Sequence, residues 1–286
     1  MQPGNLKGVI AMAAAVAAFS FMDAQLKLLA EHYPPMQVSF LRGAMSLPFI
    51  LLPILMRRRV ARLRPVNLRL HLLRGVLSVV MLTAFVYAVR ESSLAVTYSI
   101  FMFAPLLIVA VSVPMLGEQV AGAQWAAVLV GLLGVLLMLR PEPGEWVSVG
   151  AVAAVVAMVC YVLASVSLRL LARTDTAESM VFWFTAFLAF GAGLLAIRGW
   201  HGLRVEHAWL MVGVGVTGTI GQHLITAAFR AAPASVVAPF EYTALLWGVG
   251  LDLVVWGVLP GPATVIGGAV VVAAGLYLMA RERRAR

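Results

Sequence analysis

The sequence carries very little charge for its length. Of its 286 residues only 12% are charged and 62% are hydrophobic, with a mean hydropathy of +0.97. Soluble domains carry about 25% charged residues, because a soluble surface has to be covered with polar groups. This chain has too few of them, so most of its outside must face hydrocarbon.

Cysteine and the motifs of cofactor-dependent chemistry are also nearly absent. Cys160 is the one cysteine, which excludes an internal disulfide, and no Cys/His cluster has the spacing of a metal site. Cys160 lies in an apolar run and is expected to be a small buried hydrophobic residue. No Gly-rich loop ends in Lys-Ser or Lys-Thr, so the sequence does not indicate ATP-driven chemistry. We expect neither a metal nor another cofactor.

Most of the sequence consists of long apolar runs. A membrane-spanning helix needs about 20 mostly apolar residues. Breaks at charges, Pro and Gly predict ten such spans, near residues 8–30, 36–56, 69–89, 93–115, 121–139, 147–171, 178–197, 207–229, 234–257 and 262–280. The connections are too short for a soluble domain, which takes at least about 50 residues. The sequence therefore predicts an all-α polytopic membrane protein with ten transmembrane helices and no separate catalytic or receptor domain.

The basic residues indicate membrane orientation rather than nucleic-acid binding. The net charge is +9, but Lys and Arg gather in short stretches between apolar segments and form no single phosphate-binding face. An even number of spans puts both termini on one side, and 14 of the 21 Lys and Arg residues fall there. The opposite side holds four arginines, or five basic residues with Lys27. The positive-inside rule therefore predicts cytoplasmic termini.

The second half of the chain repeats the first at an offset of about 142 residues. Matching positions are 8–11 with 150–153, 26–30 with 168–172, and Gly117 with Gly257. Each half has five predicted spans, an odd number, so we expect two domains, 1–141 and 142–286, that form an inverted repeat around a central cavity. Inverted repeats of this kind exchange conformations around a midplane site, as secondary transporters do. A duplicated membrane scaffold without transport is the alternative.

Motifs in both halves have the pattern of a known family. They are Pro105, Gly117-Glu118, Gln124, Gly131 and Gly134 in the first half, and residues 228–242, Trp247 and Gly257 in the second. This pattern resembles the EamA domain of the drug/metabolite transporter superfamily over essentially the whole chain. The resemblance implies a multi-pass protein of the bacterial inner membrane that exports amino acids or other small metabolites. The second half departs from the pattern because Val258, not glutamate, follows Gly257.

Charged residues inside the spans mark candidate sites, because each costs about 2.5–3.5 kcal/mol at the bilayer centre. In the first span, Phe19, Asp23 and Lys27 recur every four residues and form one stripe. The sixth span repeats the stripe, with Tyr161 in place of Phe19 and Arg169 in place of Lys27. We expect the stripes to face the interior. The alternative is that Asp23 and Lys27 neutralise each other while Lys27 reaches the outer headgroups.

Two more candidates lie in the eighth and ninth spans. Glu241 and Asp252 are separated by eleven residues, about three helical turns, and so share one face. Pro239 interrupts the helix beside Glu241, as is tolerated where freed carbonyls face protein, water or a ligand. We expect Glu241 in the cavity and Asp252 at the interface. His223 lies at a comparable depth, where it is expected to relay protons, to hydrogen-bond a substrate, or to bond to a neighbouring carbonyl.

The remaining polar groups are assigned supporting roles. Arg42 is expected to be structural, Glu118 to cap a loop or helix, and Arg74 either to reach the cytoplasm or to balance Glu241. Aromatic residues in the fourth and ninth spans suit a ligand with an apolar body and a charged end, although ordinary packing accounts for many membrane aromatics. The residues expected to bind substrate are Asp23, Tyr98, Phe101, Tyr161, His223, Glu241 and Tyr242.

These patterns predict a secondary transporter that exports amino acids or similar small metabolites by alternating access and functions as a monomer. Uptake, or drug efflux on the same fold, is the alternative within transport. An intramembrane lipid-modifying enzyme is disfavoured, because the sequence has no repeated His/Asp cluster, no Ser–His pair at a suggestive spacing and no headgroup-binding loop. A channel is disfavoured because no ring of like charges is indicated.

Overall fold

The computed structural model of the chain describes residues 3–91, 97, 100–139 and 149–257, with scattered positions between 262 and 277. Within these residues every regular element is a helix. The elements are α1 (Pro3–Ala30), α2 (Pro35–Met56), η1 (Val60–Leu63), α3 (Leu68–Glu91), α5 (Ala104–Leu116), α6 (Gly122–Leu139), α7 (Val149–Leu171), α8 (Ala177–Ala196), η3 (Ile197–Gly199), η4 (Val205–His207), α9 (Ala208–Ala231), α10 (Ala234–Val237), η5 (Ala238–Thr243) and α11 (Ala244–Trp256).

Seven helices in the described part of the chain are long and apolar enough to cross a membrane. They coincide with predicted spans one to three and six to nine. Two shorter apolar helices, Ala104–Leu116 and Trp125–Gly134, lie where the fourth and fifth spans are predicted. The predicted tenth span lies largely outside the described residues, so the count of ten remains a prediction. The polytopic, all-helical class is established.

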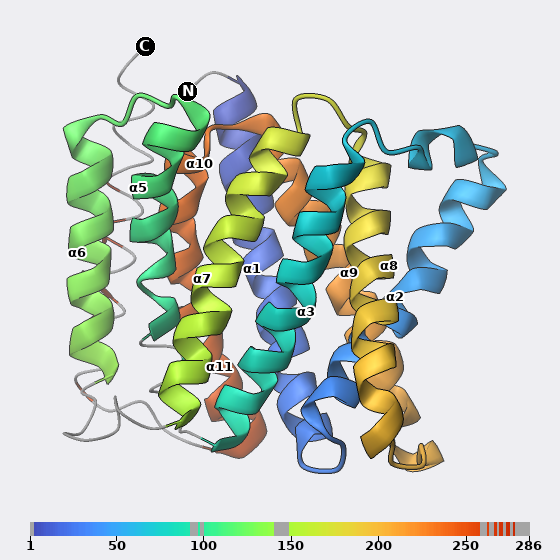
Figure 1. The fold of residues 1–286 in the computed structure, drawn as a ribbon. Helices are drawn as coiled ribbons and strands as arrows, with labels where there is room; N and C mark the ends of the chain where they lie inside the picture. The colour runs from blue at the N-terminus through green and yellow to red at the C-terminus, as the bar shows by residue number, and fades with distance from the viewer. Residues whose placement is uncertain are drawn as a thin grey trace.

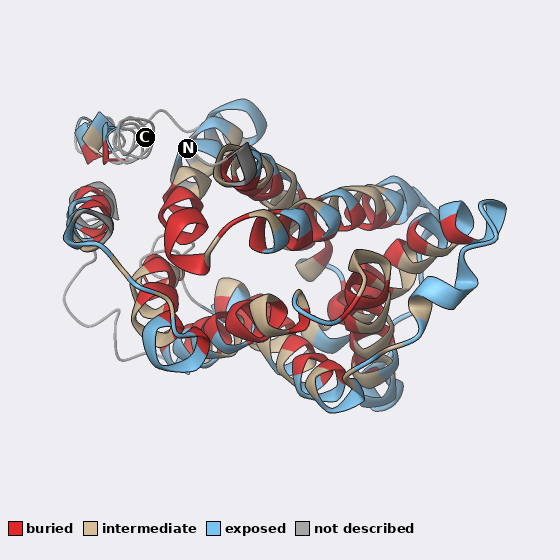
Figure 2. Ribbon diagram, turned by 90° about the horizontal axis from the view of Figure 1, so that it is seen from above, coloured by how far each residue is buried: buried red, intermediate tan, exposed pale blue. Residues whose placement is uncertain are grey.

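The helices of the first half pack against those of the second. The α1 helix lies along α9, α2 along α8, and α3 along α7 (Figure 1). Viewed from above, buried residues cover the faces that the helices turn toward one another, and exposed residues cover the outer faces (Figure 2). Many of those exposed residues are large and apolar, including Leu52, Phe190 and Val254, as expected of a surface that contacts lipid.

Close approach of the helices depends on glycine. A Cβ added at Gly43 of α2 would lie 2.7 Å from the backbone nitrogen of Ala189 on α8. A Cβ at Gly215 of α9 would lie 2.5 Å from the carbonyl oxygen of Met45 on α2. The glycine run of α9 therefore serves packing, because small residues let helix backbones touch where hydrophobicity alone gives no driving force between helices in lipid.

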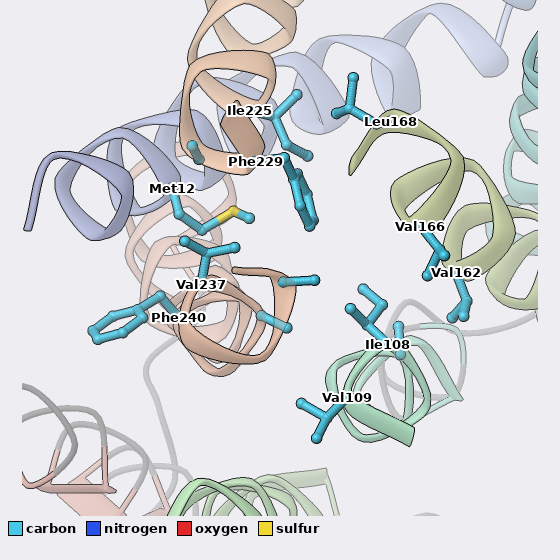
Figure 3. Close-up of a cluster of buried hydrophobic side chains, with 14 of the residues drawn as sticks. Met12, Ile108, Val109, Val162, Val166, Leu168, Ile225, Phe229, Val237 and Phe240 are labelled. Carbon is cyan, nitrogen blue, oxygen red and sulfur yellow. The ribbon is translucent and has the colours of Figure 1, made fainter. Parts of the chain in front are cut away.

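A cluster of buried apolar side chains joins α1, α5, α7, α9 and the start of the ninth span (Figure 3). Met12, Leu168 and Phe229 are among its fully buried members. These three residues belong to the beginning of α1 and the ends of α7 and α9, which lie at the top of Figure 1. We call this side of the bundle the upper face.

Glu118 caps a helix, as the sequence predicts. Its carboxylate accepts hydrogen bonds from the backbone N–H groups of Ala234 at 3.0 Å and Ser235 at 3.1 Å, at the start of α10. A negative group is favourable there, because the first N–H groups of a helix have no partner within the helix. This contact ties the end of α5 to the beginning of the ninth span. Cys160 of α7, expected to be buried, is only half-buried.

Candidate functional site

A central cavity of about 180 Å³ lies among helices from both halves of the chain. Residues of α1, α2, α3, α5, α7, α8, α9, η5 and α11 line it, together with Phe101 and Met102. Most of the wall is apolar. Its polar side chains are Ser20, Asp23, Arg42, Arg74, Tyr161, Ser165, Gln222 and Glu241, so the cavity gathers charges that are far apart in the sequence.

Two buried guanidinium groups share one aromatic ring at the cavity wall. The Cζ atom of Arg42 lies 5.7 Å from the centre of the Phe184 ring, and that of Arg74 lies 4.7 Å from it. Cation–π contacts of this kind partly compensate the charges. Few of the hydrogen-bond donors are used by the described residues: Nε of Arg42 donates to Sδ of Met22 at 3.3 Å, and one terminal nitrogen of Arg74 donates to the Met180 carbonyl at 3.4 Å.

Unsatisfied donors and acceptors accompany these charges. Within the described part of the chain, Nε of Arg74 and Oε1 of Glu241 are buried without a hydrogen-bond partner. Each guanidinium has five N–H donors and each carboxylate accepts at both oxygens, and an unmet buried group costs about 1–3 kcal/mol. The site therefore retains unused capacity for a ligand that carries both a negative and a positive group.

The two carboxyl groups of the cavity are those of Asp23 on α1 and Glu241 on η5. Asp23 lies close enough to Arg42 for their charges to interact. Glu241 is 7% exposed, and the Tyr161 hydroxyl lies within hydrogen-bonding reach of it. Two acidic and two basic side chains thus line the same cavity.

The ninth span is interrupted beside Glu241, as Pro239 predicts. It runs as α10, then the 3₁₀ stretch η5, then α11, and Glu241 stands on η5. Pro239 accounts for the change, because it has no backbone N–H and so interrupts the α-helical ladder at that point. The Asp252 side chain lies outside the described part of the structure, so its predicted place at the interface stays a prediction.

The structure brings together four of the seven residues expected to bind substrate. Asp23, Phe101, Tyr161 and Glu241 line the cavity. The Phe101 ring lies 5.3 Å from that of Phe85 and 6.2 Å from that of Tyr161, centre to centre. These contacts make it part of the aromatic wall.

Two other candidates stand apart from the cavity, and the third, Tyr98, lies outside the described residues. The Tyr242 hydroxyl donates to the Val128 carbonyl at 3.2 Å, and its ring packs over Gly131, so Tyr242 joins the ninth span to α6. His223 is exposed and lines a second hollow, with Nδ1 2.9 Å from the Thr219 carbonyl oxygen. Its neighbour Gln222 faces the cavity instead.

Sequence reasoning missed the cavity role of Arg42 and left that of Arg74 open. The two residues are 5% and 3% exposed, and both line the cavity. The signal was available, because an intramembrane arginine carries the same insertion cost as an intramembrane carboxylate. Ser165, a member of the sixth-span stripe expected to face the interior, lines the cavity as well. Gln222 also lines it, and the sequence analysis did not predict this.

Comparison with known proteins identifies the family. Residues 6–140 match the EamA-like transporter family. The chain thus carries an EamA-type domain of the drug/metabolite transporter superfamily in its first half. The pseudopaline exporter CntI of Pseudomonas aeruginosa is 29% identical to this EamA-type protein over 276 residues, which cover 95% of each chain.

More distant relatives match over a similar length. A riboflavin transporter of Rhizobium johnstonii is 25% identical over 97% of this chain and 92% of its own. An S-adenosylmethionine uptake transporter of Rickettsia prowazekii is 20% identical over 98% of this chain and 94% of its own. A solved crystal structure of a protein superposes on this chain with a TM-score of 0.79, at 20% sequence identity. The match covers 99% of this chain and 98% of the other, so the two share the same fold. The EamA-type protein is thus a multi-pass membrane transporter.

A second polar cluster lies between α7 and α8 at the upper face of the transporter. The buried carboxylate of Asp175 accepts hydrogen bonds from His71 Nε2 at 2.9 Å, from the Val66 backbone N–H at 2.9 Å and from the Thr174 hydroxyl at 2.7 Å. Burial by itself raises the pKa of Asp175, but the bonds from these three partners outweigh it and lower the pKa below the ordinary value of 3.8. The ionised form therefore stabilises the fold.

Replacing Asp175 by Asn is expected to lower the free energy of unfolding by about 2 kcal/mol at neutral pH, since a charged acceptor of buried hydrogen bonds is lost. Because the folded pKa is lowered, the contribution of Asp175 is present above the unfolded value of 3.8 and is lost as the pH falls below it. Thermal unfolding in detergent across this range measures the difference. Glu206→Gln, which alters an exposed ion pair with Arg204, is the control expected to have no effect. Equal unfolding temperatures of wild type and Asp175→Asn at neutral pH would contradict this assignment.

Proposed function

We propose that the protein is a secondary transporter that exports small zwitterionic metabolites, with amino acids as the expected class. The observation that carries this proposal is the pairing of two arginines with two carboxyl groups in one cavity of about 180 Å³. Guanidinium groups suit the carboxylate of a substrate, and Asp23 and Glu241 suit its ammonium group. The volume is below the range of about 300–1,000 Å³ for drug-sized ligands, which favours a small solute over a drug.

In this proposal the cavity residues have distinct roles. Arg42 and Arg74 bind the carboxylate, Asp23 and Glu241 bind or sense positive charge, and Phe101 and Tyr161 form the wall beside the side chain of the substrate. Tyr242 supports the ninth span by packing. His223 has no direct contact with substrate, since it does not line this cavity.

Alternating access between two inverted units, 1–141 and 142–286, is the proposed mechanism. The packing supports it. If the two units are exchanged, α1 corresponds to α7, α2 to α8 and α3 to α9. The α1–α9 contact then corresponds to α7–α3 and the α2–α9 contact to α8–α3, and all four contacts are present. The matched glycines support it as well. Gly117 ends α5 and Gly257 follows α11, each with φ of +67°. We include the ten-helix count in this proposal.

We further propose that the transporter lies in a bacterial inner membrane as a monomer, with the upper face in the cytoplasm. The excess of Lys and Arg on the side of the predicted termini supports this orientation. Export is favoured by the name of the exporter relative. Uptake is the alternative, because the name of another relative describes uptake of S-adenosylmethionine.

Counterflow in proteoliposomes tests this function. Vesicles loaded with an unlabelled amino acid are expected to accumulate the labelled form transiently and saturably, and empty vesicles are not. Amides of the same amino acids, which lack the carboxylate, are expected to compete poorly because they leave Arg42 and Arg74 unpaired. S-adenosylmethionine and riboflavin complete the panel. Absence of counterflow for every amino acid, or equal competition by acids and amides, would overturn the proposed substrate class.

A further inference from the structure

A second hollow of about 970 Å³ opens at the upper face, apart from the central cavity. It lies between the end of α2, the start of α8 and the end of α9. Below it, the Ser46 hydroxyl donates to the Gly215 carbonyl at 3.2 Å, and the Thr219 hydroxyl lies 3.3 Å from the Ser46 carbonyl. These bonds hold α2 and α9 together, and the hollow lies between them and the upper face.

The mouth of the hollow is strongly basic. Arg57, Arg59, Arg62 and Arg230 line it, and Glu178 is the one carboxylate among the described residues of its lining. Arg62 pairs with Glu178 at 2.7 Å, and Arg230 donates to the Asp175 carbonyl at 2.5 Å. Within the described part of the chain, no hydrogen bond or ion pair engages the guanidinium groups of Arg57 and Arg59, and both residues are exposed. Arg59 lies near enough to Glu178 for their charges to interact. Two positive charges are thus available at the mouth.

The inner wall of the same hollow is apolar. Phe49 and Ile54 of α2 and Ile220 and Leu224 of α9 belong to its lining. Phe49 is 41% exposed and Ile220 is 49% exposed, although both belong to helices of membrane-spanning length. A surface of this kind at membrane depth contacts acyl chains rather than water. Positive charge at the mouth above an apolar wall matches an amphiphile with an anionic head.

We propose that this hollow binds one anionic phospholipid, with its phosphate on Arg57 and Arg59 and an acyl chain along Ile54, Ile220 and Leu224. Basic pockets between transmembrane helices on the cytoplasmic side bind anionic headgroups in this way. The inference rests on the proposed orientation, which places the upper face in the cytoplasmic leaflet, and is independent of the transported substrate. A free phosphate compound shares the headgroup chemistry, and the experiment separates the two.

Native mass spectrometry of the purified full chain tests the proposal. The protein is released from micelles that contain equal amounts of phosphatidylglycerol and phosphatidylethanolamine. Wild type is expected to retain one phosphatidylglycerol in preference to phosphatidylethanolamine. Arg57→Gln with Arg59→Gln is expected to reduce this retention about tenfold or more, since each arginine near the headgroup contributes to the attraction. Arg57→Lys with Arg59→Lys keeps the charge and should retain most of the preference.

The matched control replaces Arg198 and Arg204 by Gln on the opposite face of the protein, and leaves retention unchanged. Inorganic phosphate at millimolar concentration should not displace the lipid, because it makes no contact with the apolar wall. Equal retention of the two lipids by wild type, or full retention by the double Gln variant, would overturn the proposal. Complete displacement by phosphate would also overturn it, in favour of a free anion. Counterflow is measured separately, so loss of lipid selectivity and loss of the proposed transport are distinguished.

Discussion

Glu241→Gln is expected to reduce the counterflow rate by about 30-fold or more while leaving the protein folded. The substitution nearly preserves shape but removes the charge that we assign to the ammonium group of the substrate. Truncating one partner of a buried charge pair costs about 2–5 kcal/mol, and each 1.4 kcal/mol is a factor of ten. Initial rates of counterflow at several substrate concentrations measure the effect.

The control for this prediction is Glu31→Gln, which makes the same chemical change at an exposed residue between α1 and α2. It is expected to transport like the wild type. Elution of both variants as monodisperse protein on gel filtration shows that the fold is kept. If Glu241→Gln transports at the wild-type rate, Glu241 is not part of the binding site, although the fold and the family are unaffected.

Gly43→Val is expected to lower the stability of the protein by about 3 kcal/mol or to prevent folding. A Cβ at residue 43 would lie 2.7 Å from the backbone nitrogen of Ala189 and 2.8 Å from its Cα atom. Backbone atoms cannot rotate away as a side chain can, so α2 and α8 must separate. Overpacking costs about 1–3 kcal/mol and occasionally more. Thermal unfolding in detergent, followed by gel filtration, measures the loss.

Gly248→Val is the matched control, because a Cβ at residue 248 would meet no described atom within 4 Å apart from its chain neighbours and the backbone of its own helix. It is expected to unfold at or above the wild-type temperature, since glycine is a poor helix former. A wild-type unfolding temperature for Gly43→Val would show that α2 and α8 do not pack as closely as described. Residue 43 follows Arg42, so the separation should also reduce counterflow in any protein that does fold.

Part of the cavity could be located from the sequence for a simple reason. Asp23 and Glu241 drew attention because a charge inside an apolar span is costly wherever it lies, and both line the cavity. The cost applies equally to Arg42 and Arg74, but the sequence does not show whether an arginine reaches the membrane surface or turns inward. That outcome depends on Phe184, a residue of a helix that is more than a hundred positions away from both arginines in the sequence.

Neighbouring residues illustrate the same limit. Gln222 lines the central cavity and His223 lines the second hollow. Consecutive residues of an α-helix point about 100° apart, so the rotation of α9 about its axis decides which of them enters the cavity. The contacts of α9 with α1 and α2, made through glycines, set that rotation. None of these contacts can be read from the periodicity of α9 alone.

The amino-acid sequence by itself determined that the protein is helical and lies in a membrane, because hydrophobicity and span length are properties of composition and local order. It also located several of the costly buried charges. Only the tertiary structure decided which charges share a cavity and which arginines line the second hollow. Those features arise from contacts between segments far apart in the chain, and such contacts depend on how the helix faces fit together.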